Sequence, residues 1–380
     1  MRLGKMKVSH YINYFVIGLI TLVMGTVSLV GGRFDNSLLF LLEKISISII
    51  LAVSLSLVVG FLGELSLGHA GFMCVGAYLG GKVASMLVPV LGNGILAFLV
   101  ALVVGCVAAA ICGVIIGIPA LRLRGDYLAI VTLAFGEIVK SLFLNSSDAS
   151  FGGSLGLDTP RFDKNYLYVI CLLLVLLTLA VVQNYIRSKH GRAVTAIRDN
   201  EIAARATGIN VTKYKLLTFI LSAAFAGIAG VLYSYSNYTV QSMKFGYNYS
   251  IEILVMVVLG GMGSVNGSII AAALITFLNT KLATILTGEL AVLQNLLYAL
   301  ILIVIVIYNN APALKSFRDK YNLSILTKKI FKSKNDPSHV HDDEAKWDKI
   351  PTKIEMNEIL SIDMKPQNLN SDKREKGGDE

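Results

Sequence analysis

Charge is scarce in this sequence. Asp, Glu, Lys and Arg make up 16% of its 380 residues, whereas about a quarter of an average soluble domain is charged. Hydrophobic residues account for 54%, which excludes an intrinsically disordered chain and argues against an ordinary soluble enzyme. Cysteine is also rare, and all four cysteines lie inside apolar segments without the spacing of metal ligands. We therefore expect neither a metal site nor a disulfide.

The sequence also lacks a phosphate-binding loop. Gly76 to Lys82 has the glycine and lysine spacing of such a loop, but Val83 stands where Ser or Thr would bind magnesium. The segment also lies within an apolar run. We expect a protein that is not an enzyme and binds no cofactor, so any ATP would be hydrolysed by another polypeptide.

The charged residues are divided unequally along the chain. Residues 1–320 hold 23 Lys and Arg and 13 Asp and Glu, a net charge of +10, whereas residues 321–380 hold 11 and 12, a net charge of −1. The later part therefore has a composition suited to water. We predict a membrane domain over 1–310 and a polar, disordered cytoplasmic tail over 311–380.

Long apolar runs recur through the first part of the chain. A helix needs about 20 mostly apolar residues to cross the hydrocarbon core of a membrane. No soluble core could cover so many runs, so the predicted fold class is an all-α polytopic membrane protein. The ten expected spans are 11–31, 38–62, 69–88, 95–118, 127–145, 166–186, 216–238, 249–266, 268–287 and 290–308.

The distribution of Lys and Arg predicts the orientation, because short positive loops stay in the cytoplasm. Arg2, Lys5 and Lys7 place the N-terminus there, and ten spans return the C-terminus to the same side. The first run is expected to be a retained span, since it exceeds the apolar region of a cleaved signal peptide. The positive charge thus marks a cytoplasmic face at a lipid bilayer rather than a nucleic-acid surface.

The longest cytoplasmic loop, residues 187–213, is basic yet rich in small side chains. Asn200 precedes an alanine-rich run and Gly208 follows it at the position of a helix C-cap, which predicts one or two short helices. Small side chains let another protein surface come close. A solvated loop or an amphipathic helix on anionic lipid is the alternative to a docking role.

Two glycine-rich segments, 63–72 and 259–268, interrupt apolar runs. Transporters often bind solute where helices are interrupted near the middle of the membrane, whereas close helix packing or a turn is the alternative. The candidate solute-pathway residues are Ser66, Gly68, His69, Gly71, Gly260, Gly261, Gly263 and Ser264.

A few charged residues lie within the expected spans. A charge at the centre of the bilayer costs about 2.5–3.5 kcal/mol on insertion scales, so these side chains should face protein or water. Glu64, Glu137 and Glu252 are candidates for an internal role. Lys44 lies near the start of a predicted span, where we expect its side chain to extend to the membrane interface.

Four blocks of the sequence resemble, in the same order, the signatures of branched-chain amino acid ABC transporter permeases of the LivM type. The blocks are Gly63–Phe72 with Gly76-Ala77-Tyr78 after it, Leu121–Val139, Gly191–Asn210 and Leu259–Ser264. The resemblance implies a bacterial inner-membrane permease that moves solute by alternating access.

The same resemblance implies partners. These are a second related permease, two ABC ATPase subunits and an extracytoplasmic binding protein that delivers leucine, isoleucine or valine. Loop 187–213 would couple the ATPases to the spans, and Glu201, Ala203, Ala204 and Gly208 fall at the positions of the family's docking motif. From their clustering on this loop, we also hypothesise that Arg198, Glu201 and Arg205 pair with ATPase charges. The candidate coupling residues are Arg192, Arg198, Glu201, Ala203, Ala204, Arg205 and Gly208.

Three alternative functions fit the same chain. An ABC permease for urea or short amides would share these blocks, and the ligand of its binding protein would distinguish it. An ion-coupled secondary transporter would use the intramembrane acids and need no ATPase. A membrane anchor without transport activity would gain nothing from paired glycine-rich breaks.

Overall fold

The computed structural model describes residues 17–18, 35–92, 94–123, 125–160, 164–285, 299–300 and 303. The chain divides into two units, Met1–Asn309 and Asn310–Glu380, and every described residue belongs to the first. The expected tail, and nearly all of the expected spans at 11–31 and 290–308, lie outside the described residues.

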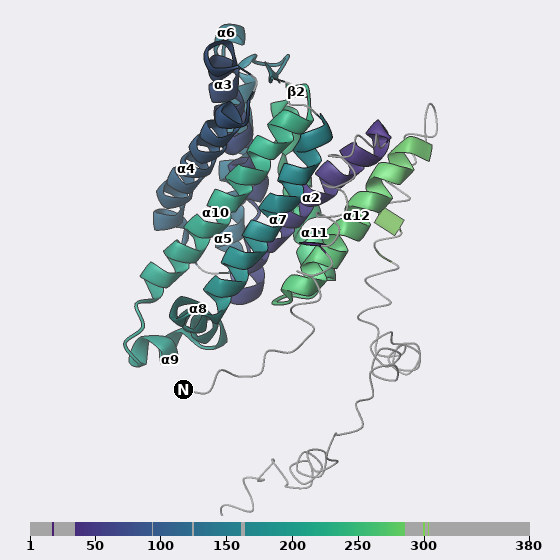
Figure 1. Ribbon diagram of the computed structural model, residues 1–380. Helices are drawn as coiled ribbons and strands as arrows, with labels where there is room; N and C mark the ends of the chain where they lie inside the picture. Colours follow the sequence, from purple (N-terminus) through teal and green to yellow (C-terminus); the bar gives the residue numbers. More distant parts are fainter. Residues whose placement is uncertain are drawn as a thin grey trace, which may run out of the picture. The chain divides into compact units, whose positions relative to one another are not determined.

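Seven helices in the described part are long and apolar enough to cross a membrane (Figure 1). They fall on seven of the expected spans and confirm the class of a polytopic, mostly helical membrane protein, while the total of ten stays a prediction. They are α2 (Asn36–Ser56, continued by the π-helical η1, Leu57–Leu62), α3 (His69–Leu91), α4 (Ile95–Ala120), α5 (Asp126–Leu144), α7 (Lys164–Arg187), α10 (Val211–Ser236) and α12 (Val265–Ile285).

Helices α2, α3, α4 and α10 form the packed centre of the unit. Every residue of α2 from Ser46 to Ser56 is buried, although most soluble helices bury only one face. A Cβ added to Gly76 of α3 would lie 2.3 Å from the carbonyl oxygen of Gly227 in α10, so the two backbones are in contact. Gly76, which resembles part of a phosphate-binding loop, is therefore a helix-packing residue.

Helix α4 instead exposes a continuous apolar stripe. Its exposed side chains recur at every fourth position, as expected for one face of an α-helix. In a membrane this face would contact lipid tails. The stripe consists of Leu99, Val103, Val107, Ile111 and Ile115.

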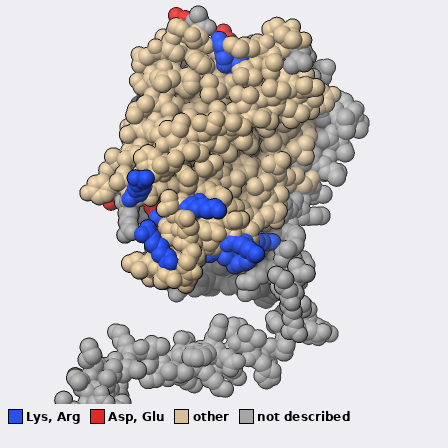
Figure 2. Space-filling view, turned by 90° about the vertical axis from the view of Figure 1, so that its left-hand side faces the viewer, with Lys and Arg blue, Asp and Glu red and all other residues tan. Residues whose placement is uncertain are grey.

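Short elements occupy the two ends of the helix bundle. At one end, strand β1 (Leu157–Asp158) pairs antiparallel with β2 (Thr239–Val240), near α6 (Asp148–Phe151). At the other end lie α8 (Lys189–Asp199) and α9 (Glu201–Ala206) (Figure 1). In the view of Figure 2, Lys and Arg gather mainly at this α8–α9 end, which the sequence assigns to the cytoplasm.

Residues 249–266 do not form one continuous helix, so the prediction of a single span there is wrong. After the 3₁₀ turn η2 (Ser242–Phe245), helix α11 runs only from Tyr247 to Leu259. Its 13 residues extend about 20 Å, less than the bilayer core of about 30 Å. The chain then turns through Gly261 and Gly263, whose φ angles of +90° and +85° favour glycine.

Candidate functional site

The first glycine-rich segment is an interruption between two helices, as predicted. Helix η1 ends at Leu62, and α3 begins only at His69. The His69 ring is buried, with its Nε2 atom 2.8 Å from the Ser54 hydroxyl oxygen. A Cβ added to Gly68 would lie 2.5 Å from the backbone oxygen of Thr132 on α5. These contacts show helix packing at His69 and Gly68.

The remaining candidate residues of this segment are also enclosed. A Cβ on Gly71 would lie 2.8 Å from the Cα atom of Gly136 on α5. Ser66 is buried, and its hydroxyl has no hydrogen-bond partner among the described residues. Ser66 is therefore the residue of this segment that retains unused hydrogen-bonding capacity.

The second glycine-rich segment packs against η1, the helix that ends where the first segment begins. A Cβ added to Gly60 of η1 would lie 2.5 Å from the backbone nitrogen of Gly263. Gly260 packs equally closely on Gly267, whose N–H donates to the Ser264 hydroxyl oxygen at 3.1 Å. The two breaks, far apart in sequence, are thus joined through a close backbone contact at Gly60, near the start of α12.

The coupling loop folds into two short helices, α8 and α9, which confirms the sequence prediction. The Asn200 side-chain oxygen accepts hydrogen bonds from the N–H groups of Ile202 and Ala203, both at 3.0 Å, and so caps α9. Gly208 has φ +84° and donates to the carbonyl of Arg205 at 3.0 Å. These bonds set both ends of α9.

The exposed side of α9 is available to a partner. Ile202 has 76% of its surface exposed, and Ala203 is exposed beside it, whereas Ala204 is buried against the protein. The exposed side of α9 therefore presents one large apolar side chain beside a small one.

Arg198, at the end of α8, reaches the contact between the two breaks. Its Nη1 atom donates to the carbonyl oxygen of Gly60 at 3.1 Å, and its Nη2 atom pairs with Asp199 at 3.0 Å. The aliphatic part of Arg198 packs on Gly63, and its Nη1 atom lies beside Gly263. One arginine therefore contacts both glycine-rich segments.

A second link joins α9 to the membrane helices. The Lys215 ammonium group, at the start of α10, lies 2.5 Å from Glu64 and 3.3 Å from Glu201. Glu201 also pairs with Arg205 at 2.6 Å. Only 5% of the Lys215 side chain is exposed, so this ion cluster is largely buried. Sequence reasoning missed Lys215 and Gly60, because their partners lie far along the chain.

These contacts change the interpretation of the charged loop residues. Arg198 and Glu201, expected to pair with ATPase charges, have partners within this chain. Arg205 also has one, yet 58% of its side chain stays exposed, and Arg192 is exposed as well. The geometry therefore favours a connecting role for Arg198 and Glu201.

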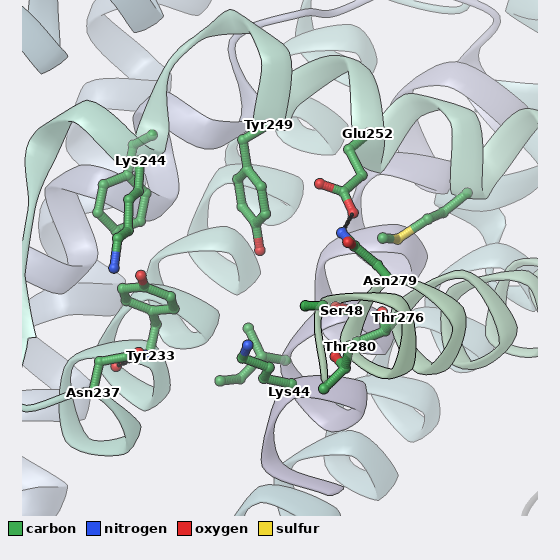
Figure 3. Close-up of a pocket in the computed structure, with 14 residues that line it drawn as sticks. Lys44, Ser48, Tyr233, Asn237, Lys244, Tyr249, Glu252, Thr276, Asn279 and Thr280 are labelled. Atoms are coloured by element: carbon green, nitrogen blue, oxygen red, sulfur yellow. Dashed lines mark hydrogen bonds between the residues drawn. The ribbon is translucent and has the colours of Figure 1, made fainter. Parts of the chain in front are cut away.

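Near the other end of the bundle lies a polar cavity of about 360 Å³ (Figure 3). It opens among α2, α10, η2, α11 and α12. None of the predicted pathway residues lines it. Its lining consists of Lys44, Ile47, Ser48, Tyr233, Asn237, Lys244, Phe245, Tyr249, Glu252, Met256, Thr276, Asn279, Thr280 and Ala283.

Two charged residues that we expected within spans, Lys44 and Glu252, line this cavity. Glu252, a predicted internal acid, accepts a hydrogen bond from Asn279 at 3.0 Å. The Lys44 ammonium group lies 4.6 Å from the centre of the Phe40 ring. The Lys44 side chain lines the cavity, and its expected extension to the membrane interface stays a prediction. Glu137, by contrast, pairs with Lys140 and accepts from the backbone N–H of Tyr247.

A smaller hollow of about 280 Å³ lies toward the α8–α9 end. It is lined partly by Gly263 and Ser264, so two of the predicted pathway residues do border open space. Gln183, Arg187 and Asn266 add polar groups. Among the described residues, no group of three or more His, Cys, Asp or Glu is placed to hold a metal ion.

The fold and these sites define a polytopic helical membrane protein with a helical loop at one end and a polar cavity nearer the other. The family described as the permease component of branched-chain amino acid transport systems matches residues 37–306. The chain belongs to this family, whose members are transport components and not enzymes.

Individual relatives agree with the family. The chain is 38% identical over 260 residues to the high-affinity branched-chain amino acid transport system permease protein LivM of Salmonella typhimurium strain LT2, covering 60% of each chain. It is 27% identical over 299 residues to the ribose import permease protein RbsC of Escherichia coli K12, covering 72% of this chain and 86% of RbsC. It is also 30% identical over 143 residues to a probable permease LivH of Methanocaldococcus jannaschii, covering 37% and 44%. The chain thus matches about 60% of the length of LivM.

Proposed function

We propose that this chain is a membrane-spanning subunit of an ABC importer for leucine, isoleucine or valine, located in the bacterial inner membrane with both termini in the cytoplasm. The observation that supports this most strongly is its family membership together with its 38% identity to LivM. Two ATPase subunits, a second related permease and an extracytoplasmic binding protein would complete the transporter. The similarity to a LivH protein supports the second permease.

The coupling geometry supports movement by alternating access. Helices α8 and α9 would receive the closure of the ATPases through the exposed face around Ile202. Arg198 would pass this movement to Gly60 and to the turn at Gly263. Gly60 lies in η1, which continues α2, and Gly263 lies two residues before the start of α12. Because α2 and α12 both line the polar cavity, a displacement of the loop could open or close that cavity.

Reconstitution in lipid vesicles would test the proposal. The purified assembly of both permeases and the ATPases, with ATP inside and binding protein outside, should accumulate radiolabelled leucine. Vesicles with a non-hydrolysable ATP analogue are the matched control and should accumulate none. Uptake of ribose or urea instead of leucine would contradict the proposed solute. Uptake driven by an ion gradient without ATPase subunits would establish a secondary transporter.

A further inference from the structure

The polar cavity is lined by charged side chains of both signs, the ammonium groups of Lys44 and Lys244 and the carboxylate of Glu252. Lys44 on α2 and Glu252 on α11 both line it (Figure 3). In the part of the chain that the structure describes, they form no ion pair with each other. A charge within a membrane protein is stabilised by water, by a partner or by a bound ligand. The space between these two groups is therefore suited to a molecule that carries both charges.

The neighbouring groups leave hydrogen-bonding capacity for such a molecule. The Glu252 carboxylate has oxygen sites for about four hydrogen bonds, of which Asn279 supplies one at 3.0 Å. Thr276 is 93% buried (7% exposed), and its hydroxyl has no hydrogen-bond partner among the described residues. The Tyr249 hydroxyl points into the cavity between the two charged groups (Figure 3).

The remaining lining of the cavity is partly apolar, and the cavity is large enough to hold a small molecule. Ile47, Phe245, Met256 and Ala283 contribute aliphatic or aromatic surface. Small-molecule sites in proteins commonly enclose about 300–1,000 Å³, and this cavity has about 360 Å³. It combines the cationic groups of Lys44 and Lys244, the anionic group of Glu252 and an apolar surface around one small volume.

We infer that this cavity is the solute site and that it recognises a zwitterionic α-amino acid with an apolar side chain. Lys44 binds the α-carboxylate, and Glu252, positioned by Asn279, binds the α-ammonium group. Ile47 and Met256 contact the side chain of the solute. The inference rests on the proposed function and adds the location of the site and the charge pairing. It also gives a reason for excluding a neutral sugar, which would bring no opposite charge to either group.

Solute-protected cysteine labelling in the full transporter tests this site. Thr280, which lines the cavity, is changed to cysteine after the four native cysteines are replaced by alanine. The matched control is Leu274→Cys on the same helix, which is exposed and outside the polar cavity. A charged thiol reagent should label T280C, and leucine should slow this labelling at least fivefold without protecting L274C.

The chemistry of recognition is tested with two fragments of leucine. 4-Methylpentanoate lacks the ammonium group, and 3-methylbutan-1-amine lacks the carboxylate, so each should need at least a tenfold higher concentration for the same protection. Glu252→Gln and Lys44→Met, each added to T280C, should raise the half-protecting leucine concentration at least tenfold. Lys281→Met, a charge removal outside the cavity, should not change it. An unchanged labelling rate without leucine shows that the variants are folded.

The outcomes separate this inference from the proposed function. If the transporter accumulates leucine but leucine does not protect T280C, the site is wrong and the function stands. Equal protection by leucine and either fragment also contradicts the charge pairing. If leucine protects T280C with the expected fragment pattern but ATP does not drive uptake, the site is supported and the proposed function fails.

Discussion

The Arg198 guanidinium group donates a hydrogen bond to the carbonyl oxygen of Gly60 at 3.1 Å. This bond joins residues that are 138 positions apart in the sequence and connects the surface helix α8 to the end of the α2–η1 span. The last six residues of this span, η1, form a π-helix rather than an α-helix. Such irregular turns often occur at functional positions. Arg198 therefore connects α8 directly to η1, the continuation of the cavity-lining helix α2.

Arg198→Ala should uncouple ATP hydrolysis from transport. The variant loses the bond to Gly60 and the packing on Gly63, but the exposed face of α9 remains available to the ATPase. We expect leucine uptake per ATP hydrolysed to fall at least fivefold while ATPase activity persists. Paired uptake and phosphate-release assays in vesicles measure this ratio. Lys189→Ala on the same helix is the control, since Lys189 is exposed and is not one of the predicted coupling residues. An unchanged ratio in R198A would show that this contact does not transmit movement.

Lys215→Met should destabilise the protein strongly. The substitution leaves Glu64 and Glu201 partly buried without the ammonium group between them. Removal of one partner from a buried ion pair typically costs about 3–5 kcal/mol, so thermal unfolding in detergent should occur at a clearly lower temperature. Lys213→Met changes an exposed lysine on the same helix and is the control.

Restoring charge balance provides a second test of the Lys215 cluster. The double variant Lys215→Met/Glu64→Gln removes one of the uncompensated carboxylates. Its unfolding temperature should therefore recover part of the loss seen in K215M. If K215M and K213M unfold at the same temperature, the cluster contributes little to stability.

Local sequence patterns predicted the elements but not the contacts between them. The apolar runs predicted seven helices that the structure describes, and Asn200 and Gly208 predicted the ends of α9. These features depend on residues close together in the chain. The short helix α11 was missed because the expected span at 249–266 ran through the glycine-rich segment, whereas the helix ends at Leu259 and the chain turns where Gly261 and Gly263 have positive φ angles.

Local sequence patterns could not predict which residues come together around the cavity. Lys44 and Glu252 were visible as charges in apolar segments, but nothing local indicates that α2 and α11 bring them to one cavity. The glycine-rich segments drew attention to the pathway, yet Gly60 and Gly263 serve a close backbone contact beside Arg198. These two glycines let the two backbone segments approach closely. The polar groups suited to a solute, Lys44 and Glu252, lie on α2 and α11.

Gly60→Ala should disturb the contact between the two breaks. The added methyl group would lie 2.5 Å from the backbone nitrogen of Gly263, so one backbone segment must move. Overpacking of this kind costs about 1–3 kcal/mol and should also lower leucine uptake. Gly136→Ala is the control, because its added Cβ would meet nothing closer than 3.8 Å. Comparable unfolding temperatures and uptake for both variants would contradict close packing at Gly60.

Asn200→Ala should loosen α9 without altering the membrane helices. The alanine side chain cannot accept the hydrogen bonds from the N–H groups of Ile202 and Ala203, and the loss of an N-cap costs about 0.5–2 kcal/mol. Hydrogen–deuterium exchange should therefore be faster across Glu201–Ala206 and unchanged in α2. Asn200→Asp keeps the acceptor oxygen and should preserve protection. Because a loosened α9 transmits ATPase closure less efficiently, uptake per ATP should fall in N200A and not in N200D; equal exchange in both variants would show that the cap does not hold this helix.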